Sequence, residues 1–412
     1  MQTQSIDYRP TVRACFVGYI VQAVVNNFAP LLFLTFQAQY GVPLSQVTLL
    51  ITFNFLLQLL VDCASVFFID RIGYRASALL AHGFSAAGLI MLAILPQILP
   101  SAFVGLLISV FFYAIGGGLL EVIISPLVEA CPSDHKAQTM SILHSFYCWG
   151  SAAVIVLSTL FLAAFGRDSW RVLAVLWALL PLVNGLVFTR VPIATLIEEG
   201  ERGLTLKQLL SLKTFWLLMA LMLCAGASEQ AVSQWASTFV ERGLGVTKAL
   251  GDLTGPTVFS LLMGLSRAFY GKKGDRLNLE RLMLASCALC VVAYLLIGLT
   301  RHPLAGLAGV ALAGLSVGLA WPGTFSRAAV AIPKGGTAMF ALFALAGDLG
   351  CSAGPTLAGA VAGALGENLR LGILSGVIFP AGMAVLLILL GRHMSVDSAD
   401  GQLLPPPGKA RC

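Results

Sequence analysis

Charge is scarce in this chain. Asp, Glu, Lys and Arg make up 11% of the 412 residues, whereas hydrophobic residues make up 58%. A soluble domain carries about 25% charged residues, so this composition excludes a soluble enzyme. The mean hydropathy of +0.89 agrees with that conclusion. No polar stretch is long enough for a soluble domain of working size, so the function must lie inside or across a membrane.

The sequence also lacks the signatures of cofactors and metals. No Gly-x-x-x-x-Gly-Lys-Ser/Thr loop is present to bind ATP phosphates. The nine cysteines are scattered and do not show the paired spacing of a zinc site. We therefore expect no cofactor and no metal. The absence of an Asn-x-Ser/Thr sequon favours a bacterial source, and the first apolar run is too long for a cleavable signal peptide.

Long apolar runs are what the chain has in abundance. The core of a bilayer is ~30 Å thick, so about 20 residues span it as a helix. The expected fold class is an all-α membrane protein whose twelve transmembrane helices form two pseudo-symmetric six-helix bundles surrounded by lipid. The twelve predicted spans are residues 12–38, 45–69, 76–96, 102–129, 137–165, 170–189, 214–240, 249–271, 280–299, 303–327, 335–363 and 370–391.

A polar interval near the middle divides the chain. We expect a first bundle at residues 1–190, a cytoplasmic linker at 191–213 and a second bundle at 214–392. Thr205 is a candidate cap for a short interfacial helix in the linker. Residues 393–412 include Pro405, Pro406 and Pro407, and this pattern predicts a disordered cytoplasmic tail.

The placement of positive charge predicts an orientation. Of the 25 Lys and Arg residues, 19 fall on segments that share a side with the N-terminus and six fall on the other side. Cytoplasmic loops favour Lys and Arg, so both termini are expected in the cytoplasm. This asymmetry explains the net charge of +6 better than a nucleic-acid partner does.

An internal repeat links the two halves. The loop after the second span contains Asp70, Arg71 and Arg75, and the loop after the eighth contains Asp275 and Arg276. With its twelve spans and central linker, the chain resembles the major facilitator superfamily over residues ~10–392. The resemblance implies alternating access, a monomer, and loops that lock the two halves together on the cytoplasmic side.

Other motifs give the chain a narrower resemblance to the fucose/galactose-proton symporter-like branch. They are Asn26-Asn27, Gly116–Glu121, Leu143–Tyr147 and Trp321-Pro322. The resemblance implies that helices one, four, seven and ten line a cavity. One departure is that Pro30 stands near the position where known members carry an acid in the first helix.

Ionisable residues deep within spans are costly in lipid and usually face a cavity or a partner. They are Asp62, Glu121, His144, Glu229 and Asp348. Three of them, Asp62, Glu121 and His144, lie at about the same depth by helix rise. We expect Glu121 to bind and release a coupling proton, with His144 or Asp62 as a relay, and Glu229 and Asp348 as further candidates. Alternatives are a static Glu121–His144 pair and an Asp62 that only fixes helix packing or pairs with the Asp-Arg loop.

Amide and aromatic side chains supply the candidate substrate ligands. Asn54 and Gln58 share a helix face with Asp62, and Gln230 and Gln234 share another. The remaining candidates are Asn26 and Asn27 in the first span, Trp235 and Trp321, and the more peripheral Trp149. Trp235 could equally be an interfacial anchor. Arg267 lies near an inner span end, where snorkelling to the headgroups would suffice.

The leading hypothesis from these patterns is a secondary transporter that takes up a small polar solute, such as a sugar, with protons. The energy source would be the proton gradient. An alternative keeps the fold but exports amphipathic compounds in exchange for protons. The sequence signature of such an antiporter would be a Gly-Pro motif in the fifth span, and this span has no Gly-Pro. A membrane enzyme is a third reading, but His144 and Ser145 point about 100° apart on a helix. The bacterial plasma membrane is the expected location.

Overall fold

A computed structural model describes residues 6–42, 44–194, 203–236, 239–240, 247–274, 277–300, 302–366 and 368–399. Within these ranges the regular structure is helical. Among the described residues, ten helices are long and apolar enough to cross a membrane, and a shorter apolar stretch, Phe53–Ile69, lies in the second predicted span. The helix over the eighth predicted span is less apolar, since it contains Lys248, Arg267, Lys272 and Lys273.

Each predicted span coincides with one helix or with two consecutive helices. The first half of the chain forms α1 (Arg9–Leu31), α2 (Phe33–Tyr40), α3 (Leu44–Ile72), α4 (Tyr74–Ile98), α5 (Ala102–Ala130), α6 (Lys136–Phe165), η1 (Arg167–Ser169) and α7 (Trp170–Phe188). The second half forms α9 (Lys213–Ser233), α11 (Lys248–Lys273), α12 (Leu279–Leu299), α13 (Pro303–Val317), α14 (Ala320–Ala331), α15 (Gly336–Ala364), α16 (Leu369–Ser375) and α17 (Ile378–Ala399).

The structure of the linker and of the tail can be compared with two further predictions. The linker forms α8 (Leu206–Ser211), and Thr205 caps it by accepting a hydrogen bond from the backbone N–H of Gln208. The predicted cap is therefore confirmed. The predicted disorder from His393 onwards is wrong for its first part, because α17 continues to Ala399. Residues 400–412 lie outside the described part of the chain.

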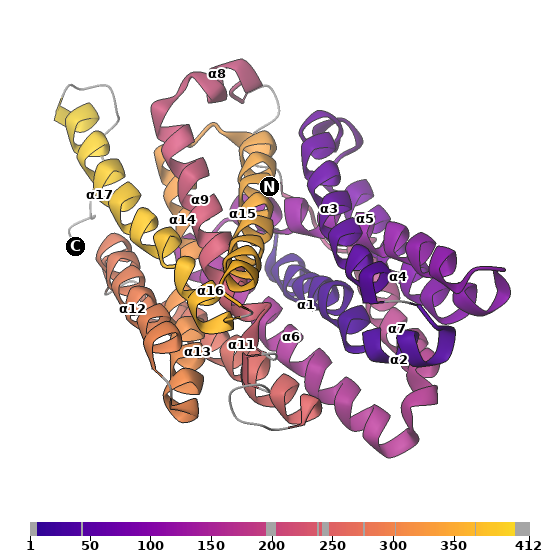
Figure 1. Ribbon diagram of the computed structural model, residues 1–412. Helices are drawn as coiled ribbons and strands as arrows, with labels where there is room; N and C mark the ends of the chain where they lie inside the picture. The colour runs from indigo at the N-terminus through magenta and orange to yellow at the C-terminus, as the bar shows by residue number, and fades with distance from the viewer. Residues whose placement is uncertain are drawn as a thin grey trace.

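The helices form two bundles that follow the two halves of the sequence. Figure 1 shows the indigo-to-magenta helices of the first half beside the pink-to-yellow helices of the second half. Within the first half α4 packs on α5 and α7, and α1 packs on α6. Within the second half α9 packs on α15, and α12 on α13. Between the halves α6 packs along α11 and α3 along α15, so two helix pairs form most of the interface.

The halves touch closely at one end of the bundle. We call it the linker end, because α3 ends there, α4 and α15 begin there, and the linker crosses there. The hydroxyl groups of Tyr74 and Thr337 are hydrogen-bonded across the halves at this end. Nearby, Ser141 of α6 donates to the Arg267 carbonyl of α11 at 2.7 Å. The linker-end helix α14 also contacts α6, whereas α13, which precedes it, packs on helices of its own half.

Glycine allows α9 and α15 to approach closely. A Cβ atom at Gly350 would lie 2.0 Å from the Leu223 carbonyl oxygen, and one at Gly354 would lie 2.4 Å from that of Ala227. Small residues at such positions let transmembrane helices pack backbone to backbone. This contact places Glu229 of α9 and Asp348 of α15 in one bundle core.

We predict that Gly350→Ala lowers the thermal stability of the purified protein. The added methyl group meets backbone rather than a movable side chain, and overpacking of this kind typically costs about 1–3 kcal/mol. Gly363→Ala is the matched control on the same helix, because its Cβ would meet nothing within 4 Å. Equal melting temperatures for the two variants would contradict the close α9–α15 contact.

Candidate functional site

A cavity lies between the two halves. It encloses about 850 Å³ not occupied by protein atoms, including its opening to solvent. Its lining is Tyr19, Gln22, Asn26 and Asn27 of α1, Phe55 and Gln58 of α3, Glu121 of α5, His144, Tyr147 and Ser151 of α6, Glu229, Gln230, Ser233 and Gln234 at α9, Ser260, Met263 and Arg267 of α11, Trp321 of α14, and Asp348 and Cys351 of α15.

The cavity wall is polar. All lining residues except Phe55, Met263, Trp321 and Cys351 carry an amide, hydroxyl or ionisable group. Ten sequence candidates reach this wall, namely Asn26, Asn27, Gln58, Glu121, His144, Glu229, Gln230, Gln234, Trp321 and Asp348. The structure therefore brings together polar side chains from seven helices, α1, α3, α5, α6, α9, α11 and α15, that are far apart in the sequence.

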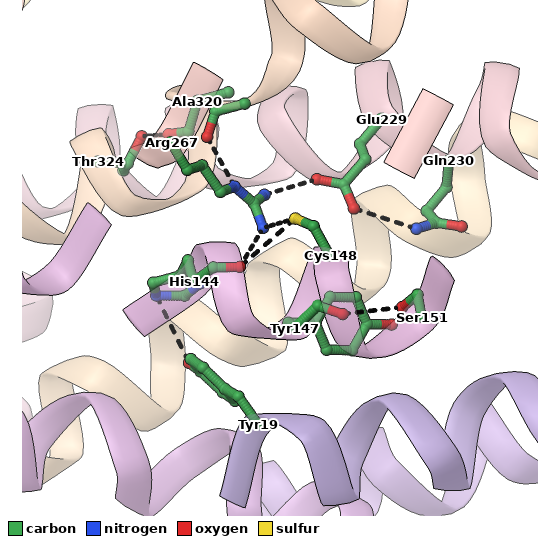
Figure 2. Close-up of polar contacts among 11 residues, drawn as sticks. Tyr19, His144, Tyr147, Cys148, Ser151, Glu229, Gln230, Arg267, Ala320 and Thr324 are labelled. Atoms are coloured by element: carbon green, nitrogen blue, oxygen red, sulfur yellow. Dashed lines mark hydrogen bonds and ion pairs between the residues drawn. The ribbon is translucent and has the colours of Figure 1, made fainter. Parts of the chain in front are cut away.

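Arg267 is the cation of the cavity wall, and it is almost fully buried, with 2% of its surface exposed. Its Nη2 lies 3.2 Å from the Glu229 carboxylate of α9. Its Nε donates to the Gly318 carbonyl at 2.7 Å, and its Nη1 donates to the His144 carbonyl at 3.0 Å and to Cys148 Sγ at 2.9 Å. Figure 2 shows the guanidinium beside Glu229, Cys148 and the backbone of His144. The prediction that Arg267 snorkels to the headgroups is wrong.

The Gly318 carbonyl is free to accept from Arg267 because the helix is interrupted there. α13 ends at Val317, and α14 begins at Ala320. A carbonyl at a helix end has no intrahelical partner. The donors of Arg267 thus reach the break in α13–α14, the acid of α9 and the backbone of α6. One guanidinium connects three elements and crosses from the second half to the first.

A chain of amides extends from the Glu229 carboxylate. Gln230 Nε2 donates to Glu229 Oε1 at 3.3 Å, and Gln234 Nε2 donates to Gln230 Oε1 at 2.9 Å. The expected shared face of Gln230 and Gln234 is confirmed by this bond. Gln234 is exposed, whereas Glu229 is buried. This row leads from the buried ion pair towards the end of α9 that lies away from the linker.

Glu121 has a different environment on the opposite wall. Gln22 Nε2 donates to Glu121 Oε2 at 2.8 Å. A neighbouring amide pair joins Gln58 of α3 to Asn26 of α1 at 2.9 Å. The hydrogen-bond partner of Glu121 is therefore neutral, in contrast to the guanidinium that binds Glu229. A carboxyl group held by a neutral amide can be ionised or protonated without losing a charged partner.

His144 does not form the expected direct pair with Glu121. The nearest hydrogen-bonding atoms to its Nε2 are the hydroxyl oxygens of Tyr19 and Ser125, each at 3.4 Å. Its ring stacks against Phe325 with centroids 5.8 Å apart. Ser145 donates to the Ile142 carbonyl at 2.6 Å, so its hydroxyl is not directed at the His144 ring. The candidate pair of Ser145 and His144 is therefore not assembled as a nucleophile and a base.

Four candidates lie outside the cavity wall. Trp235 donates from Nε1 to the Pro355 carbonyl at 3.1 Å and joins α9 to α15. Trp149 is 37% exposed and packs against Gly264 of α11. Asn54 and Asp62 are buried but do not line the cavity. Direct substrate contact predicted for Trp235, Trp149 and Asn54 is not supported, because their side chains meet protein or the outer surface.

The loop arginine that we expected to lock the halves binds within its own half. Arg75 donates to the carbonyls of Phe188, Thr189 and Val191, at and just beyond the C-terminal end of α7. The contact that crosses the halves here is instead that of the neighbouring Tyr74. Arg71 is exposed, and the Asp70 side chain, like Asp275 and Arg276, lies outside the described part of the structure.

Sequence reasoning missed Arg267, Tyr147, Ser151 and Ser260 as wall residues. Two signals could have found Arg267, Tyr147 and Ser151. His144, Tyr147 and Ser151 recur at helical spacing and therefore share one face. The second signal is Glu229 itself, because a carboxylate near mid-membrane needs a cation from another span.

We predict that Arg267→Met strongly destabilises the protein. Removing one member of a buried ion pair leaves the other unpaired, which typically costs about 3–5 kcal/mol. The double variant Arg267→Met/Glu229→Gln should regain much of the lost thermal stability. Lys207→Met, at an exposed position of α8, is the control. Equal losses in the single and double variants would show that Glu229 is not the partner that matters.

The family model of the Major Facilitator Superfamily matches residues 14–355. No curated protein matches the chain. Among solved structures, the E. coli fucose:proton symporter FucP is similar with a TM-score of 0.77 and 14% identity, over 93% of this chain and 99% of that one. The proton:xylose symporter XylE, bound to 6-bromo-6-deoxy-D-glucose, gives a TM-score of 0.78 and 10% identity, over 92% and 94%.

The human organic anion transporter MFSD10 is also similar, with a TM-score of 0.70 and 17% identity over 93% of this chain and 100% of that one. At such identities the structural similarities concern the fold. They agree with the two bundles and the interhelical cavity described above. Because the family model covers most of the sequence, the protein belongs to the major facilitator superfamily.

Proposed function

We propose that this protein is a secondary active transporter that takes up a small polar solute, with sugars as the leading class, together with protons. As a member of its family it is a membrane transporter and not an enzyme. The observation that carries the proposal is a polar cavity between two bundles that holds a carboxyl group, Glu121, bonded to a neutral amide. Alternating access would expose this cavity to each side of the membrane in turn.

The lining suits a hydroxylated, uncharged ligand. Asn26, Asn27, Gln230 and Gln234 offer amide donors and acceptors on opposite walls. Trp321 adds an aromatic surface on α14. Small-molecule sites combine a few placed polar groups with aromatic walls in this way. Two of the structural neighbours are named as symporters of fucose and xylose, and this supports a sugar without identifying one.

Proton coupling is assigned chiefly to Glu121. Its carboxyl faces the cavity and accepts from Gln22, so a proton can arrive and leave without breaking an ion pair. Glu229 is less suited to this role because Arg267 holds its carboxylate. His144 is less suited to a relay, because its Nε2 lies near the hydroxyl groups of Tyr19 and Ser125 and the hydrogen-bond partner of Glu121 is Gln22. The proton gradient would supply the energy, with no further cofactor.

Export of amphipathic compounds is the weaker alternative. An apolar cavity would favour it, whereas the observed wall is mostly polar. Transport of an organic anion also fits less well. The wall carries the carboxyl groups of Glu121, Glu229 and Asp348 against one guanidinium, which is already paired with Glu229. A neutral solute avoids repulsion from these acids.

The orientation follows from the Lys and Arg distribution. We place both termini and the linker end in the cytoplasm, and the protein in a bacterial plasma membrane as a monomer. The tight linker-end contacts then close the cytoplasmic side. The exposed Gln234 lies towards the outer opening of the cavity.

We predict that a monosaccharide raises the melting temperature of the purified protein, because a ligand that binds only the folded state stabilises it. The probes are L-fucose, D-galactose, D-xylose and D-glucose, with mannitol and glucuronate as a linear polyol and an anionic control. Gln230→Ala should abolish the shift, whereas Trp149→Phe should keep it. Stabilisation by glucuronate alone would contradict the choice of a neutral sugar.

We predict that Glu121→Gln uncouples transport from protons. In proteoliposomes the variant should still exchange the sugar that passes the thermal screen but should not accumulate it when a pH gradient is imposed. Gln keeps the shape and a hydrogen bond to Gln22 but cannot take up a proton. Continued pH-driven accumulation would rule out Glu121 as the coupling site.

A further inference from the structure

A second pair of acids lies where the two halves meet. Asp62 belongs to α3 and Asp348 to α15, and these helices pack along each other across the interface. Figure 1 shows α3 and α15 as neighbours from differently coloured halves. Asp62 is 0% exposed and Asp348 is 4% exposed. The two carboxyl groups interact with each other across this helix contact.

Three of the four carboxyl oxygens of this pair receive no hydrogen bond from the described residues. Neither oxygen of Asp62, nor Oδ2 of Asp348, finds a hydrogen-bond donor among the described residues. Two ionised carboxylates can only accept hydrogen bonds, so they cannot satisfy each other. Leaving both ionised in a dry contact would combine charge repulsion with lost hydration. A single proton between them supplies one O–H donor and removes one negative charge.

Within the described part of the chain, the titratable groups that interact with this pair include no cation that could take the place of this proton. Two further groups interact electrostatically with the Asp62 carboxyl group. They are the Glu121 carboxyl group of α5 and the Cys63 thiol of α3. On α15 the neighbouring thiol is that of Cys351, which lines the same cavity as Asp348, Glu121 and Glu229. Glu229 of α9 is already held by Arg267. Among the described residues, the titratable groups acting on Asp62 are therefore acids or thiols.

We propose that Asp62 and Asp348 bind one proton jointly, across the interface between the two halves, and that this proton stabilises the state in which the linker end is closed. Asp348 lines the cavity, whereas Asp62 lies behind it. The cavity therefore gives the proton access through Asp348. Opening of the linker end separates α3 from α15 and breaks the shared bond. The site is distinct from Glu121 but rests on the proposed alternating access.

The sign of the pH effect follows from linkage. A proton that binds only the closed state shifts the equilibrium towards that state as the pH falls. As the pH rises, the proton leaves, the carboxylates repel each other and the linker end opens. For one proton exclusive to the closed state, the ratio of closed to open molecules should change by up to about tenfold per pH unit.

The test measures this equilibrium directly, without substrate. Spin labels at Ser133→Cys in the α5–α6 loop and Arg281→Cys in α12 report the distance across the linker end, since both positions are exposed. Cys63 and Cys412 are replaced by Ser in every sample. Distances are measured by double electron–electron resonance in lipid nanodiscs at several values between about pH 5 and pH 9.

In the spin-labelled parent protein, which keeps both Asp62 and Asp348, the fraction of molecules with a closed linker end should fall as the pH rises. Asp62→Asn and Asp348→Asn should each stay closed over the whole range, because the Asn amide donates permanently to the remaining carboxyl group. Either variant suffices if the other does not fold. Lys207→Met, at an exposed position of α8, is the control and should keep the pH response of the parent protein, and Glu121→Gln is measured in parallel to show whether the response comes from that acid instead.

Two outcomes would overturn the proposal. One is a pH response in Asp62→Asn and Asp348→Asn equal to that of the parent protein. The other is a response that disappears in Glu121→Gln but persists in both Asn variants. Neither outcome affects proton coupling by Glu121, which the accumulation assay tests separately.

Discussion

The buried guanidinium of Arg267 imposes the constraint on which the rest of the site depends. A charge far from water must be matched by an opposite charge and by acceptors for its remaining donors. Glu229 supplies the charge, and the carbonyls of Gly318 and His144 supply acceptors. This requirement fixes α9, α11, the break before α14 and the adjoining part of α6 relative to one another. The wall of the cavity follows from that arrangement.

The acids of the cavity consequently fall into two classes. Glu229 is neutralised by Arg267 and serves to hold the second half together and to anchor the row of Gln230 and Gln234. Glu121 and the Asp62–Asp348 pair have no such cation in the described structure. In a low dielectric such groups can respond to protons, whereas an ion pair resists change. Fixed charge and exchangeable charge are thus placed on different helices.

The sequence predicted the features that depend on length and depth. The apolar runs located the helices, the capping pattern located α8, and helix rise placed Glu121, Glu229 and Asp348 deep in the bundle. The sequence could not show how far each helix rotates about its own axis. Trp149 and Cys148 are adjacent in the sequence, yet Cys148 meets Arg267 while Trp149 faces the outside. That difference is decided by packing between the halves.

Arg267 was misjudged for a related reason. By position it lies near the end of its span, where a long side chain can reach the headgroups. The tight contact of α6 with α11 closes that route and turns the side chain towards Glu229. Similarly, Arg75 looked like a lock between halves but satisfies the carbonyls at the C-terminal end of α7, which have no partner beyond the helix end. Both outcomes depend on neighbours that only the folded structure supplies.

The central claim is that these polar groups surround a water-filled chamber open on the side away from the linker. The most direct measurement is the reaction of single cysteines with a membrane-impermeant maleimide in right-side-out vesicles. We expect Ser233→Cys, on the cavity wall, to react from outside, and Ser125→Cys, which is fully buried near His144, to remain unlabelled. Protection of Ser233→Cys from outside, or its labelling only from the linker side, would contradict the claim.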